Sequence, residues 1–251
     1  MYSKKISLIT PLRGQRTQFS NLIQSLIKNT NCPKDIEILL MVDNDDQDTP
    51  LWLEYYGKLA NEHGFTVLKF MTERSDHFTK DYINPLARYS EGRFIMNINA
   101  DSEFKTPKWD LLIYSAMDRA SWGVKDDVWL GLIKDNLRRT GEDPLYPNFA
   151  CFPLVSKQAV DYLGYFLDER FKVWGPDHFI ADVYKHIGRL VSLTHVEVDH
   201  ISIHTGKRED DGNFARFQRI HDENPVKMSH KDLDQECSKL LTLIQKLKEK
   251  K

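Results

Sequence analysis

The sequence has few cysteines, little net charge and no long apolar run, and each shortage narrows the class of protein. Its three cysteines, Cys32, Cys151 and Cys237, are odd in number and lie far apart without a Cys-x-x-Cys spacing. This pattern argues against a disulfide framework and against a thiolate metal site. It favours a reducing compartment, so we expect a cytoplasmic protein.

The charges almost cancel, with 35 basic and 37 acidic residues and a formal net charge of -2. Proteins that bind nucleic acid normally gather a basic excess on one face, so we expect no nucleic-acid partner. The first apolar run, residues 6–10, is too short for a signal sequence or for the ~20 residues of a membrane span. We therefore expect a core strand at this position and no transmembrane segment.

The composition is typical of a globular protein: of the 251 residues, 41% are hydrophobic and 29% are charged. Short apolar runs typical of buried parallel strands alternate with apolar residues at helical spacing, which predicts βαβ units on one twisted sheet. The fold class is thus α/β, with a mixed, mostly parallel sheet flanked by helices. We expect strands at 6–10, 36–42, 65–70, 92–98, 128–133, 149–155 and within 190–203, and helices at 82–89 and 177–187.

Two segments lie outside this alternation. The polar stretch 134–147 contains proline and glycine and is expected to be a mobile loop. Near the end, Leu233, Cys237, Leu240 and Ile244 are spaced four and three residues apart, which predicts an amphipathic helix within 226–251. We expect this helix to dock on a domain of residues 1–225, with a homodimer seam as the alternative. Its lysine-rich end is either solvated or a peripheral contact with an anionic membrane surface.

Polar clusters follow three of the expected strands, at residues 10–16, 43–46 and 99–103. Parallel strands end at the same edge of a sheet, so the carboxylates of these clusters should converge on one crevice. Their mutual repulsion favours a bound cation, and oxygen ligands suit Mn²⁺ or Mg²⁺. Asp101 and Glu103, two residues apart, could share this metal, although acidic pairs of this spacing also occur in solvated turns.

The stretch from Ile6 to Arg16, the acidic cluster at Asp43, Asn84 and the segment from Phe94 to Trp109 together resemble a GT-A, family-2-like glycosyltransferase over residues 6 to about 204. The resemblance implies that an Asp-x-Asp motif holds a metal and that the metal holds a donor diphosphate. Here the motif is Asp-Ser-Glu, or Asn99-Ala-Asp101 in a register two residues earlier. Metal ligands are then Asp101 and Glu103, and the residues expected at the donor are Pro11, Arg13, Asp43, Asp45, Lys80, Asn84, Asn99 and Lys207.

The resemblance also covers Trp174-Gly-Pro-Asp177, where Asp177 would be the general base of an inverting enzyme. A carboxylate within hydrogen-bond reach of the acceptor hydroxyl is the group such a reaction needs. Locally, an aspartate after Gly-Pro also suits a helix N-cap. Later in the chain, the resemblance implies a histidine ligand to the metal or the diphosphate. His204, followed by Thr-Gly-Lys207, is the better match, and His200 is the alternative.

These features predict a metal-dependent glycosyltransferase that moves a sugar from a nucleotide-sugar donor to a carbohydrate or glycoconjugate acceptor, with inversion favoured over retention. The loop at 134–147 would close over the donor and exclude water. A nucleotidyltransferase is an alternative, disfavoured because the first loop lacks a glycine-rich, lysine-bearing phosphate cradle. The other alternative is a sugar-nucleotide-binding protein without turnover.

Overall fold

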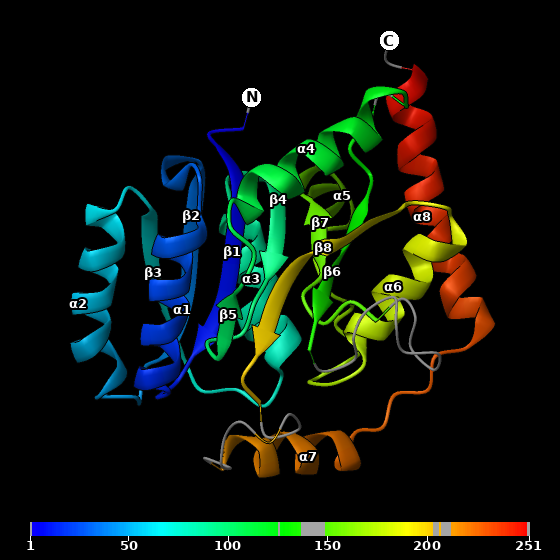
Figure 1. Ribbon diagram of the computed structural model, residues 1–251. Coiled ribbons are helices and arrows are strands. Elements are labelled where there is room, and N and C mark those ends of the chain that lie inside the picture. Colours follow the sequence, from blue (N-terminus) through cyan, green and yellow to red (C-terminus); the bar gives the residue numbers. More distant parts are fainter. Residues whose placement is uncertain (1, 125, 137–148, 203–205, 207–211, 250–251) are drawn as a thin grey trace.

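The structure is a computed structural model, and it describes residues 2–124, 126–136, 149–202, 206 and 212–249. These residues form a twisted eight-stranded sheet in the order β3-β2-β1-β4-β7-β6-β8-β5. The α/β class and the mixed, flanked sheet expected from the sequence are confirmed (Figure 1).

Two parallel groups of strands make up the sheet, joined by a short antiparallel strand. The first group contains β1 (Lys4–Leu12), β2 (Ile36–Asp43), β3 (Thr66–Thr72) and β4 (Gly92–Asn97). The second contains β6 (Leu130–Asp135) and β8 (Leu190–His200). The joining strand β7 (Leu154–Ser156) is antiparallel to both β4 and β6, and β5 (Ser102–Phe104) pairs antiparallel with β8. Because of this arrangement, β1, β2, β4 and β8 all end at one edge.

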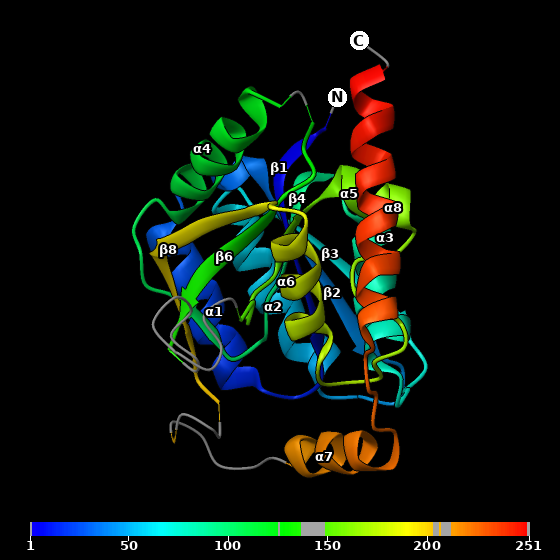
Figure 2. The same ribbon diagram turned by 90° about the vertical axis from the view of Figure 1, so that its right-hand side faces the viewer.

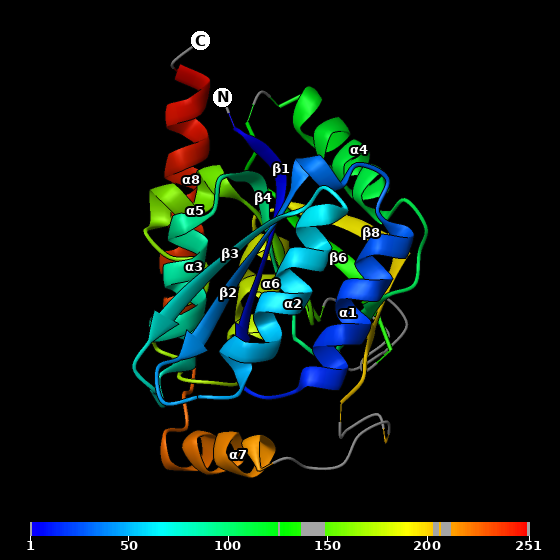
Figure 3. The same cartoon turned by 90° about the vertical axis from the view of Figure 1, so that its left-hand side faces the viewer.

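Helices cover both faces of the sheet. Three helices, α1 (Arg16–Asn29), α2 (Thr49–Glu62) and α4 (Trp109–Trp122), lie over one face (Figure 3). Their apolar side chains belong to one core cluster. The other layer contains α3 (Asn84–Tyr89), α5 (Lys157–Leu163), α6 (Pro176–His186) and α8 (His230–Glu249). One helix, α7 (Asn213–Glu223), belongs to neither layer and lies across the edge where the parallel strands end (Figure 1).

The last helix, α8, uses its apolar face inside the chain. Cys237, Leu240, Leu243 and Ile244 are buried in the layer that contains α5 and α6, and the helix runs alongside them (Figure 2). Docking on the parent fold is therefore confirmed, while the homodimer seam stays a prediction. In the part of the chain that the structure describes, no helix combines the length and apolar character needed to cross a bilayer.

Several boundaries differ from the sequence expectations. The segment expected to be a loop at 134–147 begins later, because Lys134 and Asp135 belong to β6; residues 137–148 lie outside the described residues. The strand expected at 149–155 is reduced to Leu154–Ser156, directly after Pro153, which has no backbone N–H to donate to a neighbouring strand. The helix expected at 82–89 is a π-helical turn, Thr79–Ile83, followed by α3.

Candidate functional site

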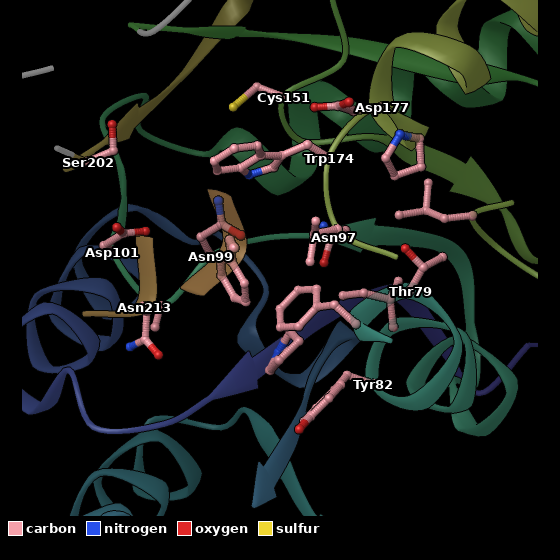
Figure 4. Close-up of a pocket in the computed structure, with 18 of the residues that line it drawn as sticks. Thr79, Tyr82, Asn97, Asn99, Asp101, Cys151, Trp174, Asp177, Ser202 and Asn213 are labelled. Carbon is pink, nitrogen blue, oxygen red and sulfur yellow. The ribbon is translucent and has the colours of Figure 1, made fainter. Parts of the chain in front are cut away.

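A cavity of about 710 Å³ opens at the edge where β1, β2, β4 and β8 end. Its size is that of a ligand pocket for a nucleotide-sized molecule. In Figure 4, Tyr82 and Asp177 lie at opposite ends of the cavity, with Asn99 and Asp101 between them and to one side. The residues around it include Pro11, Arg13, Gln15, Asp43, Phe78, Tyr82, Asn97, Asn99, Asp101, Phe149, Cys151, Trp174, Asp177, His178, His200, Phe214, Arg216 and Phe217.

At the first end, a buried carboxylate at the end of β2 is held between two donors. Arg13 Nη1 donates to Asp43 Oδ2 at 2.9 Å, and the Tyr82 hydroxyl donates to Asp43 Oδ1 at 2.5 Å. Burial and the hydrogen bond to Asp43 raise the pKa of Tyr82 to about 12, so the phenol keeps its proton at neutral pH. Arg13 also donates to the exposed Asp45, and this bond lowers the pKa of Asp45.

The loop that carries Arg13 is fixed by the loop after β2 and by the first residue of α2. The backbone N–H of Gly14 donates to Thr49 Oγ1 at 2.8 Å and to Asp46 Oδ2 at 3.2 Å. Gly14 and Gln15 both have positive φ, at 63° and 56°, a conformation that glycine adopts freely and glutamine seldom does. The chain turns sharply here so that Arg13 faces the end of β2.

In the middle of the cavity, Asp101 and His200 lie side by side. His200 Nε2 is 3.2 Å from Asp101 Oδ1 and 3.1 Å from Asn99 Nδ2, and Cys151 Sγ is 3.7 Å from His200 Nδ1. The pairing of β5 with β8 places Ser102 opposite His200, which brings the two segments together. Of the two histidines predicted for this role, His200 lies at the site, whereas His204 lies outside the described residues.

Glu103 does not share this position. It lies opposite Asp199 in the β5–β8 pair, forms an ion pair with Lys105 and is not among the described residues around the cavity. The side chains of Asp101 and Glu103 were expected to share a metal. Residues two apart point the same way only in extended backbone, and here Asp101 lies in a turn while only Ser102–Phe104 is extended.

At the second end, Asp177 lies in the first turn of α6. Gly175 is the N-cap residue, with φ 106°, and a side chain at this position would collide with the Phe171 ring. Asp177 is therefore not the N-cap, although its Oδ1 accepts the backbone N–H of His178 at 2.9 Å. Burial raises the pKa of Asp177, and the charge of His178 and this backbone bond partly offset the rise.

One wall of the cavity comes from α7, which the sequence analysis did not predict. The Trp174 ring lies between Phe214 and His221, with centroid distances of 5.4 and 5.5 Å, and Phe217 meets Phe78 at 5.2 Å. The sequence does contain a pattern that predicts this helix, since Phe214, Phe217 and His221 follow helical spacing. The residues that these rings contact, Trp174 and Phe78, could not be identified without the fold.

Among the described residues, three predicted donor residues do not line the cavity: Asp45, Lys80 and Asn84. Lys80 is exposed on the π-helical turn. Asn84 is fully buried, where its Nδ2 donates to the Leu167 carbonyl and its Oδ1 accepts the backbone N–H groups of Phe166 and Leu167. It therefore fixes the loop that leads to Trp174. Lys207 lies outside the described residues.

The residues at the middle of the cavity fit a cation that is shared with a ligand, and do not form a cage of their own. Among the described residues, no group of three or more histidine, cysteine, aspartate or glutamate side chains has metal-binding geometry. Asp101 and His200 provide one carboxylate and one imidazole. Mg²⁺ typically keeps several waters and takes one or two carboxylates plus substrate phosphates. Asp101 supplies one such carboxylate, and the His200 imidazole beside it is a ligand that suits Mn²⁺ better than Mg²⁺.

The fold is that of the GT-A glycosyltransferases, as the comparison with solved structures shows. The chain is similar to TarS of S. aureus, with a TM-score of 0.59 and 12% identity over 94% of this chain. It is also similar to the mannosyltransferase PcManGT from Pyrobaculum calidifontis in complex with GDP-Man and Mn²⁺, with a TM-score of 0.59 and 11% identity, covering 97% of this chain and 74% of that one. The chain spans 43% of the TarS chain.

A third similar structure is GalNAc-T7 with UDP, GalNAc and Mn²⁺, with a TM-score of 0.55 and 16% identity, covering 78% of this chain and 43% of that one. A structure of TarS residues 1–349 in complex with UDP-GlcNAc matches with a TM-score of 0.56 and 15% identity, covering 95% of this chain and 72% of that one. No family model and no curated protein sequence matches the chain.

Proposed function

We propose that the protein is a glycosyltransferase that moves a sugar from a nucleotide-sugar donor to a hydroxyl group of an acceptor. The observation that carries this proposal is one cavity with three chemically different positions. Tyr82 lies at one end and Asp177 at the other, with Asp101 between them and to one side (Figure 4). Asp43 and Arg13 belong to the Tyr82 end through their hydrogen bonds, and His200 lies beside Asp101. A nucleoside, a diphosphate with its cation and a sugar beside a base would occupy these positions in that order.

In this proposal the part of the cavity away from Asp177 binds and orients the nucleotide-sugar donor. Pro11 and Arg13 line the nucleoside, with Asp43 accepting hydrogen bonds from it, and Asn99 lies next to the diphosphate. Asp101 and His200 hold a divalent cation, Mn²⁺ or Mg²⁺, which supplies positive charge to the leaving diphosphate. Similar structures contain UDP-GlcNAc or GDP-Man with Mn²⁺, which supports this class of donor.

At the other end, Asp177 accepts the proton of the acceptor hydroxyl as the new glycosidic bond forms. The Asp177 carboxylate is half-buried and its pKa is raised, so it is a stronger base than a carboxylate in water, which suits this step. A base on the acceptor side of the sugar belongs to an inverting reaction. The aromatic rings of Trp174 and Phe149 in this half of the cavity would pack against a sugar, which favours a glycan acceptor.

The first experiment titrates a panel of nucleotide sugars with and without Mn²⁺ and follows both thermal stability and release of the nucleoside diphosphate. A donor that binds the native state raises the melting temperature. We expect one donor to stabilise the protein in a Mn²⁺-dependent way and to release diphosphate slowly. Stabilisation by nucleoside triphosphates with pyrophosphate release would instead identify a nucleotidyltransferase, and donor binding without release would identify a protein without turnover.

Stereochemistry is tested separately, once a donor is known. The anomeric configuration of the product, measured by NMR, is expected to be opposite to that of the donor sugar. A retained configuration would contradict the role of Asp177 as the acceptor base.

A further inference from the structure

A second, open depression of about 540 Å³ lies beside the cavity. Its walls come from two segments that are far apart in the sequence: the stretch after β3, with Arg74, Ser75 and Asp76, and α7, with Arg216 and Arg219. We call these five residues the arginine depression. Arg216 also lines the main cavity, so the two hollows share a wall.

Arg216, which lines both the cavity and the arginine depression, is fixed by hydrogen bonds. Arg216 Nη2 donates to Asp76 Oδ1 and to the Ser75 carbonyl, both at 2.7 Å, and Arg216 Nε donates to Asp76 Oδ1 at 3.1 Å. The Ser75 backbone N–H donates to the Tyr82 hydroxyl at 2.8 Å, which ties the depression to the Asp43 end of the cavity. The guanidinium of Arg216 is therefore fixed in place before any ligand arrives.

The depression is basic in a chain that is slightly acidic. Three guanidinium groups face one carboxylate there, a formal surplus of two positive charges, whereas the whole chain carries -2. Among the described residues, neither Arg74 nor Arg219 forms an ion pair within 4.0 Å, and both side chains are exposed. The charge of Arg74 helps to lower the pKa of Asp45, a carboxyl that is not one of the five residues of the depression. Forked guanidinium groups match the oxygens of a phosphate group.

The donor does not account for this charge. In the proposed function the diphosphate and its cation lie at Asp101 and His200, whereas the depression adjoins the nucleoside end through Ser75 and Tyr82. The remaining substrate is the acceptor. Three carboxylates, those of Asp43, Asp101 and Asp177, line the cavity, and Asp43 is paired with Arg13. Basic groups beside the cavity would favour the binding of an acceptor that carries negative charge.

We propose that the arginine depression binds a phosphate ester group of the acceptor. The acceptor is then an acidic molecule long enough to place one phosphate at Arg74 and Arg219 while its hydroxyl reaches Asp177. This assignment to the acceptor rests on the proposed function, but the anion site itself does not.

The first test measures the melting temperature of the protein against inorganic phosphate and glycerol 2-phosphate, with ionic strength held constant by chloride. We expect a saturable rise. The variant R74A/R219A should weaken the apparent phosphate affinity about tenfold or more, and R74K/R219K should lie between because lysine keeps the charge without the fork. The control R88A/R119A removes two exposed arginines from α3 and α4 and should bind phosphate like the wild type. An equal response in all variants, or none beyond that of chloride, would overturn the proposal.

The same variants then separate this proposal from the proposed function. Unchanged donor binding by R74A/R219A, with phosphate binding lost, supports an acceptor site. Loss of donor binding in that variant would assign the depression to the donor. Phosphate binding by a wild type that responds to no nucleotide sugar would refute the glycosyltransferase proposal and the acceptor assignment together, leaving only an anion site.

Two further measurements identify the source of the phosphate. With a known donor, a phosphate-bearing acceptor should show a KM about tenfold higher in R74A/R219A with kcat little changed. Binding to phosphatidylglycerol vesicles, without any response to soluble phosphate esters, would show instead that the depression meets lipid headgroups, and would overturn the acceptor assignment.

Discussion

Three buried or half-buried aspartates lie around the cavity, and each is distinguished by the groups bonded to it. Asp43 accepts hydrogen bonds from Arg13 and Tyr82, so it is fixed and polarised by its donors. Asp101 lies beside the His200 imidazole, which can share a cation with it. Asp177 is bonded to the backbone at the start of α6, and its pKa is raised by burial. The same side chain therefore suits three tasks at three positions.

Asp101→Asn is expected to abolish the Mn²⁺-dependent stabilisation by a donor and to lower turnover about 100-fold or more, because a neutral amide is a poor ligand for a hard cation. Isothermal titration with Mn²⁺ and the nucleoside diphosphate measures this. Glu103→Gln is the matched control, since Glu103 is paired with Lys105 away from the cavity, and its effect should be no more than about threefold. Equal losses in both variants would contradict the assignment of Asp101.

Asp177→Asn is expected to stabilise the protein at neutral pH while lowering transfer about 100-fold or more. Burial raises the pKa of Asp177 in the folded state above its unfolded value, so keeping the charge at pH 7 destabilises the fold. As the pH falls through the raised pKa, the wild-type carboxyl becomes protonated and the advantage of the variant shrinks. Thermal unfolding of both proteins between pH 7 and pH 4 measures this difference. A variant that is less stable at pH 7 would show that the carboxylate is structural.

At the scale of elements, α7 is the part that completes the site. It lies apart from both core layers, across the edge of the sheet (Figure 1). Its aromatic residues line the cavity and pack on Trp174 and Phe78. The segment 224–229 joins it to α8 and packs Val226 and Met228 against the core layer of α8. Because the aromatic residues of α7 itself line the cavity, we expect ligand affinity to depend on them more than global stability does.

Phe217→Ala is expected to lower donor affinity several-fold with only a small change in melting temperature, because the half-buried ring closes one side of the cavity. A double-mutant cycle with Phe78→Ala should give a coupling of about 0.5–1.5 kcal/mol, as for other aromatic pairs. Glu223→Ala, at the exposed end of α7, is the control and should leave affinity unchanged. A large fall in stability without a change in affinity would show that α7 is only a structural cover.

The elements also show what the sequence can predict and what it cannot. The strand β2 was predictable because its whole length is buried and so reads as one apolar run. The meeting of Asp101 with His200 depends on the register of β5 against β8, and a three-residue strand leaves too little pattern to fix a register. The predicted place of Glu103 beside Asp101 depended on side chains that alternate in direction along a strand, and this alternation applies only where the backbone is extended. Asn84 was assigned to the donor, but only the fold shows that its partners are the amides of a loop.

At the scale of the whole molecule, a short strand joins the two parallel groups of strands. In the part of the chain that the structure describes, the three-residue strand β7 pairs with both β4 and β6, and the Asn97 backbone N–H adds a hydrogen bond to the Pro153 carbonyl. A buried ion pair strengthens the second group: Arg189, before β8, donates to both carboxylate oxygens of Asp126, before β6, at 2.9 and 3.1 Å. The Arg189 guanidinium also lies over the Trp129 ring. This cluster fixes how β8, and therefore His200, is placed against β6.

Asp126→Ala is expected to lower the free energy of unfolding by about 3–5 kcal/mol, because it leaves the buried Arg189 charge without a partner. Urea unfolding measures this change. The control Glu62→Ala breaks an exposed pair with Lys58 and should cost less than about 0.5 kcal/mol. A small loss for Asp126→Ala would mean that Arg189 finds water or another acceptor when its partner is removed.

The order in which the cavity residues occur along the chain has a consequence for synthesis. The described lining begins at Pro11 and ends on α7, so more than four fifths of these 251 residues must be synthesised before its walls are all present. Until then the aromatic rings of Phe78 and Trp174 lack the partners that α7 provides. A nascent chain halted before Asn213 therefore exposes these rings to chaperones and proteases, and a ligand that needs the complete cavity would protect only chains whose translation has passed α7.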